Sequence, residues 1–279
     1  MLYLVATPIG NLKDITLRAL EVLEAADVIA CEDKRVSSKL LSHYGIVKPR
    51  NIISYHDHNA TRVRPQILSL LAQGKSVAYI TDGGMPLISD PGFKLVVACQ
   101  TEKLSYTIIP GPSAPLAALC LSGLSPDRFF FCGFLPPKQS ARRSSLEEIR
   151  SLSATLLFFE SPKRLVAFLT DALDVFGDRT GAVCREMTKL YEEVQKAPLS
   201  TLIAYYEANP PRGEIVIALE GAPKITSFIE ADIMAELQKA VELYPVKEAV
   251  DIVSKIFNKP KREIYQRALS LKSEKTGLS

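Results

Sequence analysis

The sequence predicts an α/β protein with two α/β domains and a small helical module at its C-terminus. Short apolar runs typical of buried strands alternate with stretches whose apolar residues recur at helical spacing, which favours mostly parallel sheets covered by helices. Seven Lys and Arg against three Asp and Glu give the segment from Val246 to Lys272 a balance of +4, which marks it as a basic module. Boundaries near Pro112 and Ala222 lead us to expect domains at 1–112, 113–222 and 228–279.

The first series of elements opens with the apolar run LYLVAT, which reads as a strand, and TLRALEVLEAA, which reads as a helix. The same alternation continues as far as YTIIPG, a strand that breaks at Pro110. Strands are expected at 2–7, 27–33, 76–81 and 106–111, and helices at 16–26, 65–73 and 92–100.

A second, similar series follows, opening with a helix that starts at Ser113. Strands are expected at 128–134, 155–160, 181–186 and 213–221, and helices at 113–124, 144–152 and 163–176. A Lys- and Pro-containing stretch from Ala222 to Thr226 is typical of a linker. Beyond it we expect three helices, at 231–243, 247–257 and 261–269.

Composition narrows the class of protein. The chain has 279 residues, of which 47% are hydrophobic, and no apolar stretch approaches the length of a membrane span. The N-terminus reads as a first strand and not as a signal peptide. The five cysteines are scattered and never in CxxC spacing, which favours a reducing, cytoplasmic location over disulfides or zinc. The net charge of +3 is too small to establish a nucleic-acid partner.

Several common catalytic and phosphate-binding motifs are absent from the sequence. There is no GxxxxGK[ST] and no GxGxxG between a strand and a helix, which argues against a nucleoside triphosphate or dinucleotide held in the usual way. HExxH and GxSxG are also absent. His56 and His58 alternate around Asp57 without an apolar scaffold, so we interpret them as a solvated loop and expect no metal site.

Polar and glycine-rich segments collect where the expected strands end. Ligands of open α/β sheets bind beyond the carboxyl ends of the strands, so several such segments at one edge favour a binding site over isolated turns. The segments are Thr7–Asn11, Glu32–Arg35, Asp82–Pro86, Pro110–Ala114, Glu160–Arg164 and Arg185–Glu186.

Two of these segments offer groups for a ligand of mixed charge. Asp82 with Gly83 and Gly84 combines a carboxylate with bare backbone amides, although a capped tight turn would look the same. Ser113, followed by Ala114, begins a helix whose first amides can receive a carboxylate or an adenine edge, although a plain N-cap is equally compatible.

Basic residues occupy similar loop positions. Lys163 and Arg164 stand in the first turn of an expected helix, where positive charge is unfavourable by about 0.3–1 kcal/mol each and an anionic substrate would compensate. Such residues can line a track for a phosphate backbone, although any one of them alone is more often a solvated charge. The expected substrate contacts are Lys34, Arg35, Lys138, Arg142, Arg143, Lys163, Arg164 and Arg185.

Seven motifs occur in the order TPIGNLKDIT, DVIACEDKR, YITDGGMPLISDPG, IIPGPSA, GFLPPK, FFESPKR and CREMTKLYEE. Together they resemble the ribosomal RNA small subunit methyltransferase I family, which has the tetrapyrrole-methylase-like fold. The tail VKEAVDIVSKIFNKPKREIYQRAL is similar to the helical tail of that family. The usual Asp-Ala-Gly-Thr-Pro loop of the family has Gly83 and Met85 here in place of alanine and threonine, so a hydrogen bond from the threonine hydroxyl is lost.

The resemblance implies a homodimer that transfers the methyl group of S-adenosylmethionine to a ribose 2′-oxygen. The substrate would be a cytidine in the decoding region of 16S rRNA, within the small ribosomal subunit, with no membrane involved. The cofactor would lie in a cleft between the two α/β domains. The cofactor-binding residues are then expected to be Pro8, Asp82, Gly83, Gly84, Pro86, Ile88, Ser113 and Ala114.

Methyl transfer from an activated sulfonium requires alignment of the reacting atoms and removal of the hydroxyl proton, without a metal. Glu160 is the first candidate for the base because it ends a strand beside Lys163 and Arg164, and Asp33 and Glu186 follow. Each of the three is also compatible with a role in an ion pair.

Two other functions remain open at this stage. The shared fold permits a methylase acting on a corrin or porphyrin, but the basic loops and tail argue against so small a substrate. An RNA-binding assembly factor without catalysis is favoured slightly by Met85 in the cofactor loop. The basic helices at the C-terminus are compatible with RNA contact or with a stabilising cap.

Overall fold

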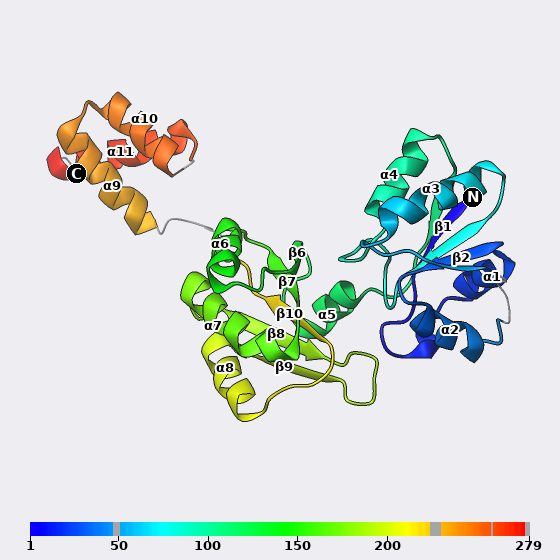
Figure 1. The fold of residues 1–279 in the computed structure, drawn as a ribbon. Helices are drawn as coiled ribbons and strands as arrows, with labels where there is room; N and C mark the ends of the chain where they lie inside the picture. The colour runs from blue at the N-terminus through cyan, green and yellow to red at the C-terminus, as the bar shows by residue number, and fades with distance from the viewer. Residues whose placement is uncertain (47–50, 224–229, 258, 277–279) are drawn as a thin grey trace. The chain divides into compact units, whose positions relative to one another are not determined.

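Residues 1–46, 51–223, 230–257 and 259–276 are described by the computed structural model of the protein (Figure 1). The chain divides into two compact units, Met1–Ala222 and Pro223–Ser279. The first unit holds two five-stranded sheets with helices packed against them, and the second is helical in its described part. The expected α/β class is therefore confirmed.

The first sheet has the strand order β3-β2-β4-β1-β5, and all neighbouring strands are parallel. Its strands are β1 (Leu2–Val5), β2 (Val28–Cys31), β3 (Ile52–Ser54), β4 (Val77–Ile80) and β5 (Tyr106–Ile109). The intervening helices are η1 (Leu12–Asp14), α1 (Leu17–Ala25), α2 (Lys34–His43), α3 (Ala60–Ala72) and α4 (Phe93–Thr101).

Helices cover both faces of this sheet, which explains why its strands are continuously apolar. Tyr79 of β4 belongs to a buried cluster with Ile67 of α3 and Leu95 of α4. Its neighbour Ile80 belongs to a different cluster, with Leu23 of α1. Successive strand residues point to opposite faces, so both faces of β4 are needed for the core.

The order of the strands creates a switch point between β1 and β4. The chain leaves β1 towards β2 on one side, whereas it leaves β4 towards β5 on the other side. Ligands of open α/β sheets bind at such a point, beyond the carboxyl ends of the two strands. Thr7 follows β1 and Asp82 follows β4, so two of the expected loops meet there.

The second sheet has the order β6-β7-β10-β8-β9 and is mixed. Only β6 and β7 are parallel, whereas β10 is antiparallel to β7 and β8, and β8 is antiparallel to β9. The strands are β6 (Phe129–Phe134), β7 (Thr155–Glu160), β8 (Thr180–Arg185), β9 (Glu193–Pro198) and β10 (Ile215–Leu219). The expectation of a mostly parallel sheet is therefore wrong for this half.

The helices of the second half also lie on both faces of their sheet. Phe158 of β7 packs in a cluster with Phe168 of α7 and Leu202 of α8, whereas the adjacent Leu157 packs with Leu119 of α5. The helical elements are α5 (Ala114–Ser122), α6 (Gln139–Ile149), η2 (Pro162–Arg164), α7 (Leu165–Phe176) and α8 (Leu199–Ala208).

Five elements were not expected from the sequence: η1, α2, β3, β9 and α8. The helix α2 contains three charged residues and a histidine, so its apolar stripe is reduced to a few positions such as Leu40 and Leu41. The strand β9 lies at the edge of its sheet and has no fully buried residue, so the apolar alternation of a half-buried strand is weak there.

The second unit contains α9 (Glu230–Leu243), α10 (Val246–Ile256) and α11 (Lys261–Thr276). Its own apolar core includes Leu237 of α9, Val253 of α10 and Ile264 of α11. The three C-terminal helices were expected, although most of the expected linker at 222–226 lies outside the described residues. Within the described ranges, no helix is both long enough and apolar enough to span a membrane.

Candidate functional site

A cavity of about 840 Å³ lies in the first unit, and both sheets contribute to its lining. The first half supplies residues that follow β1 and β4, including Pro8 and Asp82. The second half supplies residues from the ends of β6 and β7, including Phe134 and Glu160. Loops that are distant in the sequence are therefore brought together at one site, which includes the switch point of the first sheet.

The loop after β4 is held against the loop after β1. Thr7 and Gly84 exchange two backbone hydrogen bonds of 3.0 Å. Gly84 has a φ of +86°, which glycine adopts without strain. A Cβ at Gly83 would lie 3.3 Å from the carbonyl oxygen of Pro8, so the backbones approach more closely there than most side chains allow. The two glycines therefore serve the approach of two loops at the cavity.

The same loop continues in a strained conformation up to α4. Leu87 and Ser89 have positive φ angles of 75° and 64°, a region that residues with a Cβ rarely adopt. A Cβ at Gly92, whose φ is +122°, would lie 2.6 Å from Leu87 and 2.7 Å from Tyr79. The hydroxyl of Tyr79 donates to the carbonyl of Pro91 at 2.7 Å and fixes this end of the loop.

Glu32, Asp82 and Asp90 of the first half lie at or near the cavity and form no ion pair with a described residue, although Lys39 also lines the cavity. Burial, followed by the charge of Asp82, raises the pKa of Glu32 to about 7. The same two causes raise the pKa of Asp90 to about 6. The pKa of Asp82 is also raised, chiefly by burial, although its carboxylate accepts a hydrogen bond of 3.2 Å from the amide of Asp33. This side of the cavity therefore favours a positively charged ligand.

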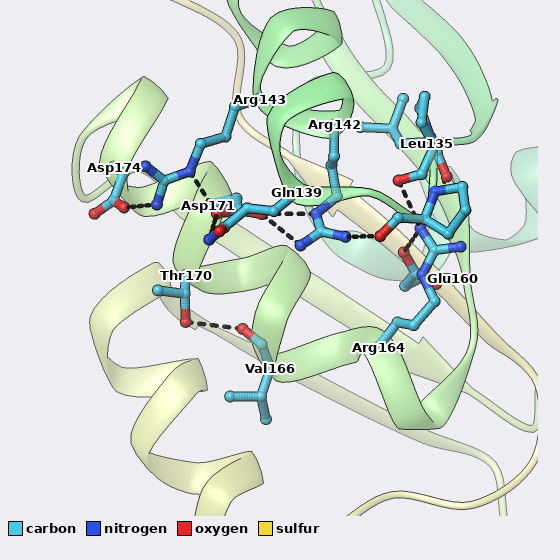
Figure 2. Close-up of polar contacts among 12 residues, drawn as sticks. Leu135, Gln139, Arg142, Arg143, Glu160, Arg164, Val166, Thr170, Asp171 and Asp174 are labelled. Carbon is cyan, nitrogen blue, oxygen red and sulfur yellow. Dashed lines mark hydrogen bonds and ion pairs between the residues drawn. The ribbon is translucent and has the colours of Figure 1, made fainter.

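Glu160 of β7 faces the cavity but is already bound. It is 3% exposed, lies 3.1 Å from Arg164, and accepts a hydrogen bond of 2.7 Å from the amide of Ser161. Arg164 also donates to the carbonyls of Leu135 and Pro136 (Figure 2). Arg164 therefore connects the carboxylate of Glu160 to the loop that follows β6.

Arg142 and Arg143 are engaged in an ion-pair cluster between α6 and α7 (Figure 2). The Arg142 guanidinium lies 2.5 Å from Asp171 and donates to the carbonyl of Pro137. Arg143 binds both Asp171 and Asp174. Because Arg142 is 4% exposed and Asp171 is fully buried, a phosphate at Arg142 would have to replace a buried ion pair.

The remaining expected substrate contacts differ in whether their side chains are bound in ion pairs. Lys34, Lys138 and Lys163 are exposed and have no ion-pair partner in the part of the chain that the structure describes. Arg35 is exposed but pairs with Asp33 at 2.7 Å, and its hydrogen bonds lower the pKa of Asp33 to about 2.

The charged residues at the end of β8 and in the loop after it form ion pairs with nearby residues of the second half. Arg185 pairs with Glu193 at 2.7 Å. Glu186 lies 2.8 Å from the ammonium of Lys189, which lowers the pKa of Glu186. Lys189 also pairs with Glu214 at 3.0 Å. The expected bases Glu160, Asp33 and Glu186 are thus each bound to a cation.

Comparison with known proteins agrees with these features. A family model described as Tetrapyrrole (Corrin/Porphyrin) Methylases matches residues 1–203, and one described as RsmI C-terminal HTH domain matches residues 228–272. "Ribosomal RNA small subunit methyltransferase I" of Mesorhizobium japonicum is 46% identical over 273 residues, 97% of this chain and 92% of that protein. The protein of the same name from Haemophilus influenzae is 43% identical over 277 residues, 97% of this chain and 96% of that protein.

The chain belongs to the ribosomal RNA small subunit methyltransferase I family. The resemblance inferred from the seven motifs is confirmed. Solved structures share the fold at lower identity. Cobalt precorrin-4 methyltransferase, a cobalamin biosynthetic enzyme, is 20% identical with a TM-score of 0.60 and covers 78% of this chain and 94% of its own. Diphthine synthase is 16% identical with a TM-score of 0.63 and covers 79% of this chain and 89% of its own.

The cofactor residues expected from the family resemblance fall into two groups. Pro8, Asp82, Gly83 and Ala114 line the cavity. The others are not among its lining residues: Gly84, Pro86, Ile88 and Ser113. Gly84 shapes the loop through its bridge to Thr7, and Ser113 occupies the N-cap of α5 without a capping hydrogen bond from its side chain.

Some cavity residues escaped the sequence-based prediction for this family member. The hydroxyls of Ser37 and Thr81 line the cavity and are almost fully buried, and a hydrogen bond from Thr81 lowers the pKa of Asp90 against the effect of burial. Asp90 also lines the cavity and stands within the quoted YITDGGMPLISDPG motif, so its position in a glycine- and proline-rich loop was an available signal. Ser37 gave no such signal because α2 itself was not expected.

Proposed function

We propose that the protein transfers a methyl group from S-adenosylmethionine to the ribose 2′-oxygen of a cytidine in the decoding region of 16S rRNA. The observation that carries the proposal is the cavity at the switch point, whose first-half carboxylates lack cationic partners among the described residues. The curated relatives carry the name ribosomal RNA small subunit methyltransferase I, which supports the choice of substrate.

The cavity residues fit S-adenosylmethionine. Its sulfonium is a cation, and Asp82 supplies a carboxylate on one side of the cavity. Its adenine and amino-acid groups carry several hydrogen-bonding atoms, and the hydroxyls of Ser37 and Thr81 are buried in the lining of the cavity. Gly83 is exposed and lines the cavity, so its backbone groups are available to a ligand. The bound cofactor supplies an activated methyl group, so the protein has to hold and orient it.

The expected cofactor residues are proposed to have three kinds of role. Pro8, Asp82, Gly83 and Ala114 form the wall of the site. Gly84 and Pro86 set the path of the loop, whereas Ile88 and Ser113 support it from outside the lining. The exposed amines of Lys34, Lys138 and Lys163, with Arg35, are available to contact rRNA phosphates. Arg164 is proposed to position Glu160 and the loop after β6. Arg142, Arg143 and Arg185 are proposed to hold their own elements in place through ion pairs and not to bind rRNA directly.

The C-terminal unit is proposed to contact rRNA as well. Lys247, Lys255 and Arg262 are exposed on α10 and α11, and the unit matches a domain described as helix-turn-helix. Neutralising the three residues as glutamines should weaken binding to small subunits and reduce the salt dependence of binding. Binding of S-adenosylmethionine should be unchanged. Unchanged binding to subunits would mean that the unit stabilises the fold.

The proposed function also implies a domain arrangement and an oligomeric state. Residues 1–112 and 113–222 act as two α/β domains that share the cofactor site, with 228–279 as a separate RNA-binding module. We propose a homodimer that acts in the cytoplasm on small subunits. Sedimentation of the full chain tests the dimer directly.

The test of the function uses small ribosomal subunits from cells that lack the protein. Incubation with methyl-labelled S-adenosylmethionine should label one cytidine ribose in the decoding region, mapped by nuclease digestion and mass spectrometry. Calorimetry with the same cofactor is run in parallel. Binding without label in 16S rRNA would indicate another substrate, such as a macrocycle, and no binding at all would favour an assembly factor.

A further inference from the structure

Among the described residues that line the cavity, four carry carboxylates: Asp82, Asp90, Glu160 and Glu214. Glu160 and Glu214 are bound to cations, at 3.1 Å from Arg164 and 3.0 Å from Lys189. A carboxylate held by a cation is a weaker base, because the cation favours its charged form. Asp82 and Asp90 are therefore the two carboxylates of the cavity that no described cation neutralises.

Asp90 differs from Asp82 in its burial and its surroundings. Asp82 is the more exposed of the two and accepts a hydrogen bond from the amide of Asp33, whereas Asp90 is more deeply buried and has no ion-pair partner within the described ranges. A proton acceptor works best when it is partly shielded from water and not already neutralised. Asp90 fits that description better than Asp82.

The backbone on both sides of Asp90 is fixed at the cost of strain. Ser89 immediately before it has a left-handed φ of 64°, and Pro91 immediately after it accepts the hydroxyl of Tyr79. A Cβ at Gly133 of β6 would lie 3.0 Å from the hydroxyl oxygen of Ser89, so this loop also approaches the second half closely. Strained backbone that the surroundings hold in place is a common feature of catalytic positions.

The charged surroundings of Asp90 tune its proton affinity. Burial and the nearby charge of Asp82 raise the pKa of Asp90 to about 6. A hydrogen bond from Thr81 acts in the other direction. Glu32, at the end of β2, is a further acidic neighbour, and the other charged residues that line the cavity are Lys39, Glu160, Lys189 and Glu214. A base whose pKa lies just below neutrality is mostly deprotonated at pH 7 and still accepts a proton readily.

We propose that Asp90 is the general base that removes the 2′-hydroxyl proton of the acceptor ribose, an inference that rests on the proposed function. In this step the O–H bond breaks and its electron pair forms the new bond from oxygen to the methyl carbon. The electron pair of the methyl–sulfur bond remains on sulfur, which becomes a neutral thioether. The proton passes to the Asp90 carboxylate and then to water.

The experiment measures single-turnover methylation of small subunits between pH 5 and 9 for the parent and for Asp90→Asn. The parent rate should fall about tenfold per pH unit below pH 6 and level off above it. Asp90→Asn should lose about 10²- to 10⁴-fold at pH 8 and lack the acidic limb. Glu160→Gln is the matched control and should keep that limb, whatever its rate.

Three further readouts separate a base from a structural or binding role. In the free protein, a carboxyl carbon resonance that titrates near pH 6 should be missing from Asp90→Asn. Calorimetry should give the variant an affinity for S-adenosylmethionine within about threefold of the parent. Asp90→Ala should regain part of its rate when formate is added, because a small carboxylate can replace the missing base.

Each result has a definite meaning. Asp90→Asn with the parent rate and the parent acidic limb would overturn the inference, as would loss of cofactor binding in a folded variant. A parent protein that titrates near pH 6 but labels no ribose would instead overturn the proposed function. Formate rescue specific to Asp90→Ala supports Asp90 as the base.

Discussion

The carboxylates beside the cavity in the first half and the ion-paired carboxylates of the second half have pKa values shifted in opposite directions. In the first half, burial raises the pKa values of Glu32, Asp82 and Asp90. In the second half, hydrogen bonds from Arg and Lys lower the pKa values of Asp171 and Glu186. Carboxylates bound to cations hold elements together, whereas carboxylates left unbound near a cavity are available to a cationic ligand or a proton.

The largest effect on stability is expected at Asp171, whose buried ion pairs join α6 and α7 of the second half. Burial alone would raise the pKa of Asp171, but hydrogen bonds from Arg143, Gln139 and Arg142 outweigh it. Asp171→Ala would leave the buried guanidinium of Arg142 without its partner and should lower the free energy of unfolding by about 3–5 kcal/mol. Urea unfolding followed by circular dichroism measures the change.

A double variant serves as the control for this pair. Arg142→Met with Asp171→Leu removes both charges and should recover most of the lost stability, because no buried charge is then unpaired. If the double variant were as unstable as Asp171→Ala, the shape of the packing and not the ion pair would be responsible.

The next largest effect is expected in the strained loop of the first half. The added methyl of Gly92→Ala would collide with Leu87 and Tyr79, and the φ of +122° is unfavourable for alanine. We expect a loss of about 2 kcal/mol in unfolding free energy and at least tenfold weaker binding of S-adenosylmethionine by calorimetry.

Gly74→Ala is the matched control for Gly92→Ala. Gly74 also has a positive φ, of +81°, but nothing lies within 4 Å of its added methyl. This variant should lose about 1 kcal/mol of stability from backbone strain alone and keep the parent affinity. Equal losses of affinity in both variants would contradict the role of the loop.

A smaller effect is expected in the pH dependence of stability. Glu32 of the first half and Glu186 of the second half should contribute with opposite signs. The folded pKa of Glu32 is raised to about 7 from 4.5, so the native state retains a proton that the unfolded state loses. Stability from this group therefore falls as the pH rises from about 4.5 to 7. Glu32→Gln should raise the melting temperature at pH 8 but not at pH 4.

Glu186 supplies the opposite case. Its folded pKa is lowered, first by the hydrogen bond from Lys189, so its contribution is present above the ordinary pKa of 4.5 and is lost as the pH falls. Glu186→Gln should therefore lower the melting temperature at pH 8. Scanning calorimetry of both variants tests the contrast, and shifts of the same sign would contradict it.

The smallest effect is expected at an exposed ion pair of the first half. The side chain of Arg35 is 88% exposed, and such pairs add little to stability. Arg35→Ala should leave the urea midpoint unchanged, while the pKa of Asp33 rises from about 2 towards 3.8 in a carboxyl NMR titration. A large fall in the midpoint would show that the pair is structural.

Much of the fold could be predicted from the sequence because the central strands are continuously apolar. β1, β4, β7 and β10 lie inside their sheets, and hydrophobic periodicity reports burial directly. Strand direction was harder to predict, because β10 is antiparallel to both of its neighbours and its apolar run is the same in either direction. The edge strand β9 lacks the burial that makes a strand recognisable.

The site was predictable where it depends on loop composition and not where it depends on partners. The glycine-rich loop at Asp82 and the strand end at Glu160 were singled out, and both line one cavity. The sequence does not show that Asp171, 29 residues after Arg142, neutralises that arginine. It also does not show which carboxylates lack a cation, because that depends on contacts between distant segments.

The position of β10 has a consequence for biosynthesis. This strand is the last of the first unit to be made, yet it fills the middle of its sheet between β7 and β8. Until residue 219 leaves the ribosome, two long strand edges of the nascent chain stay unsealed and open to mispairing. While the helices after β10 are being made, the chain is still attached to the ribosome and β10 can pair with β7 and β8. A chain that ended soon after residue 219 would be released before this pairing was complete.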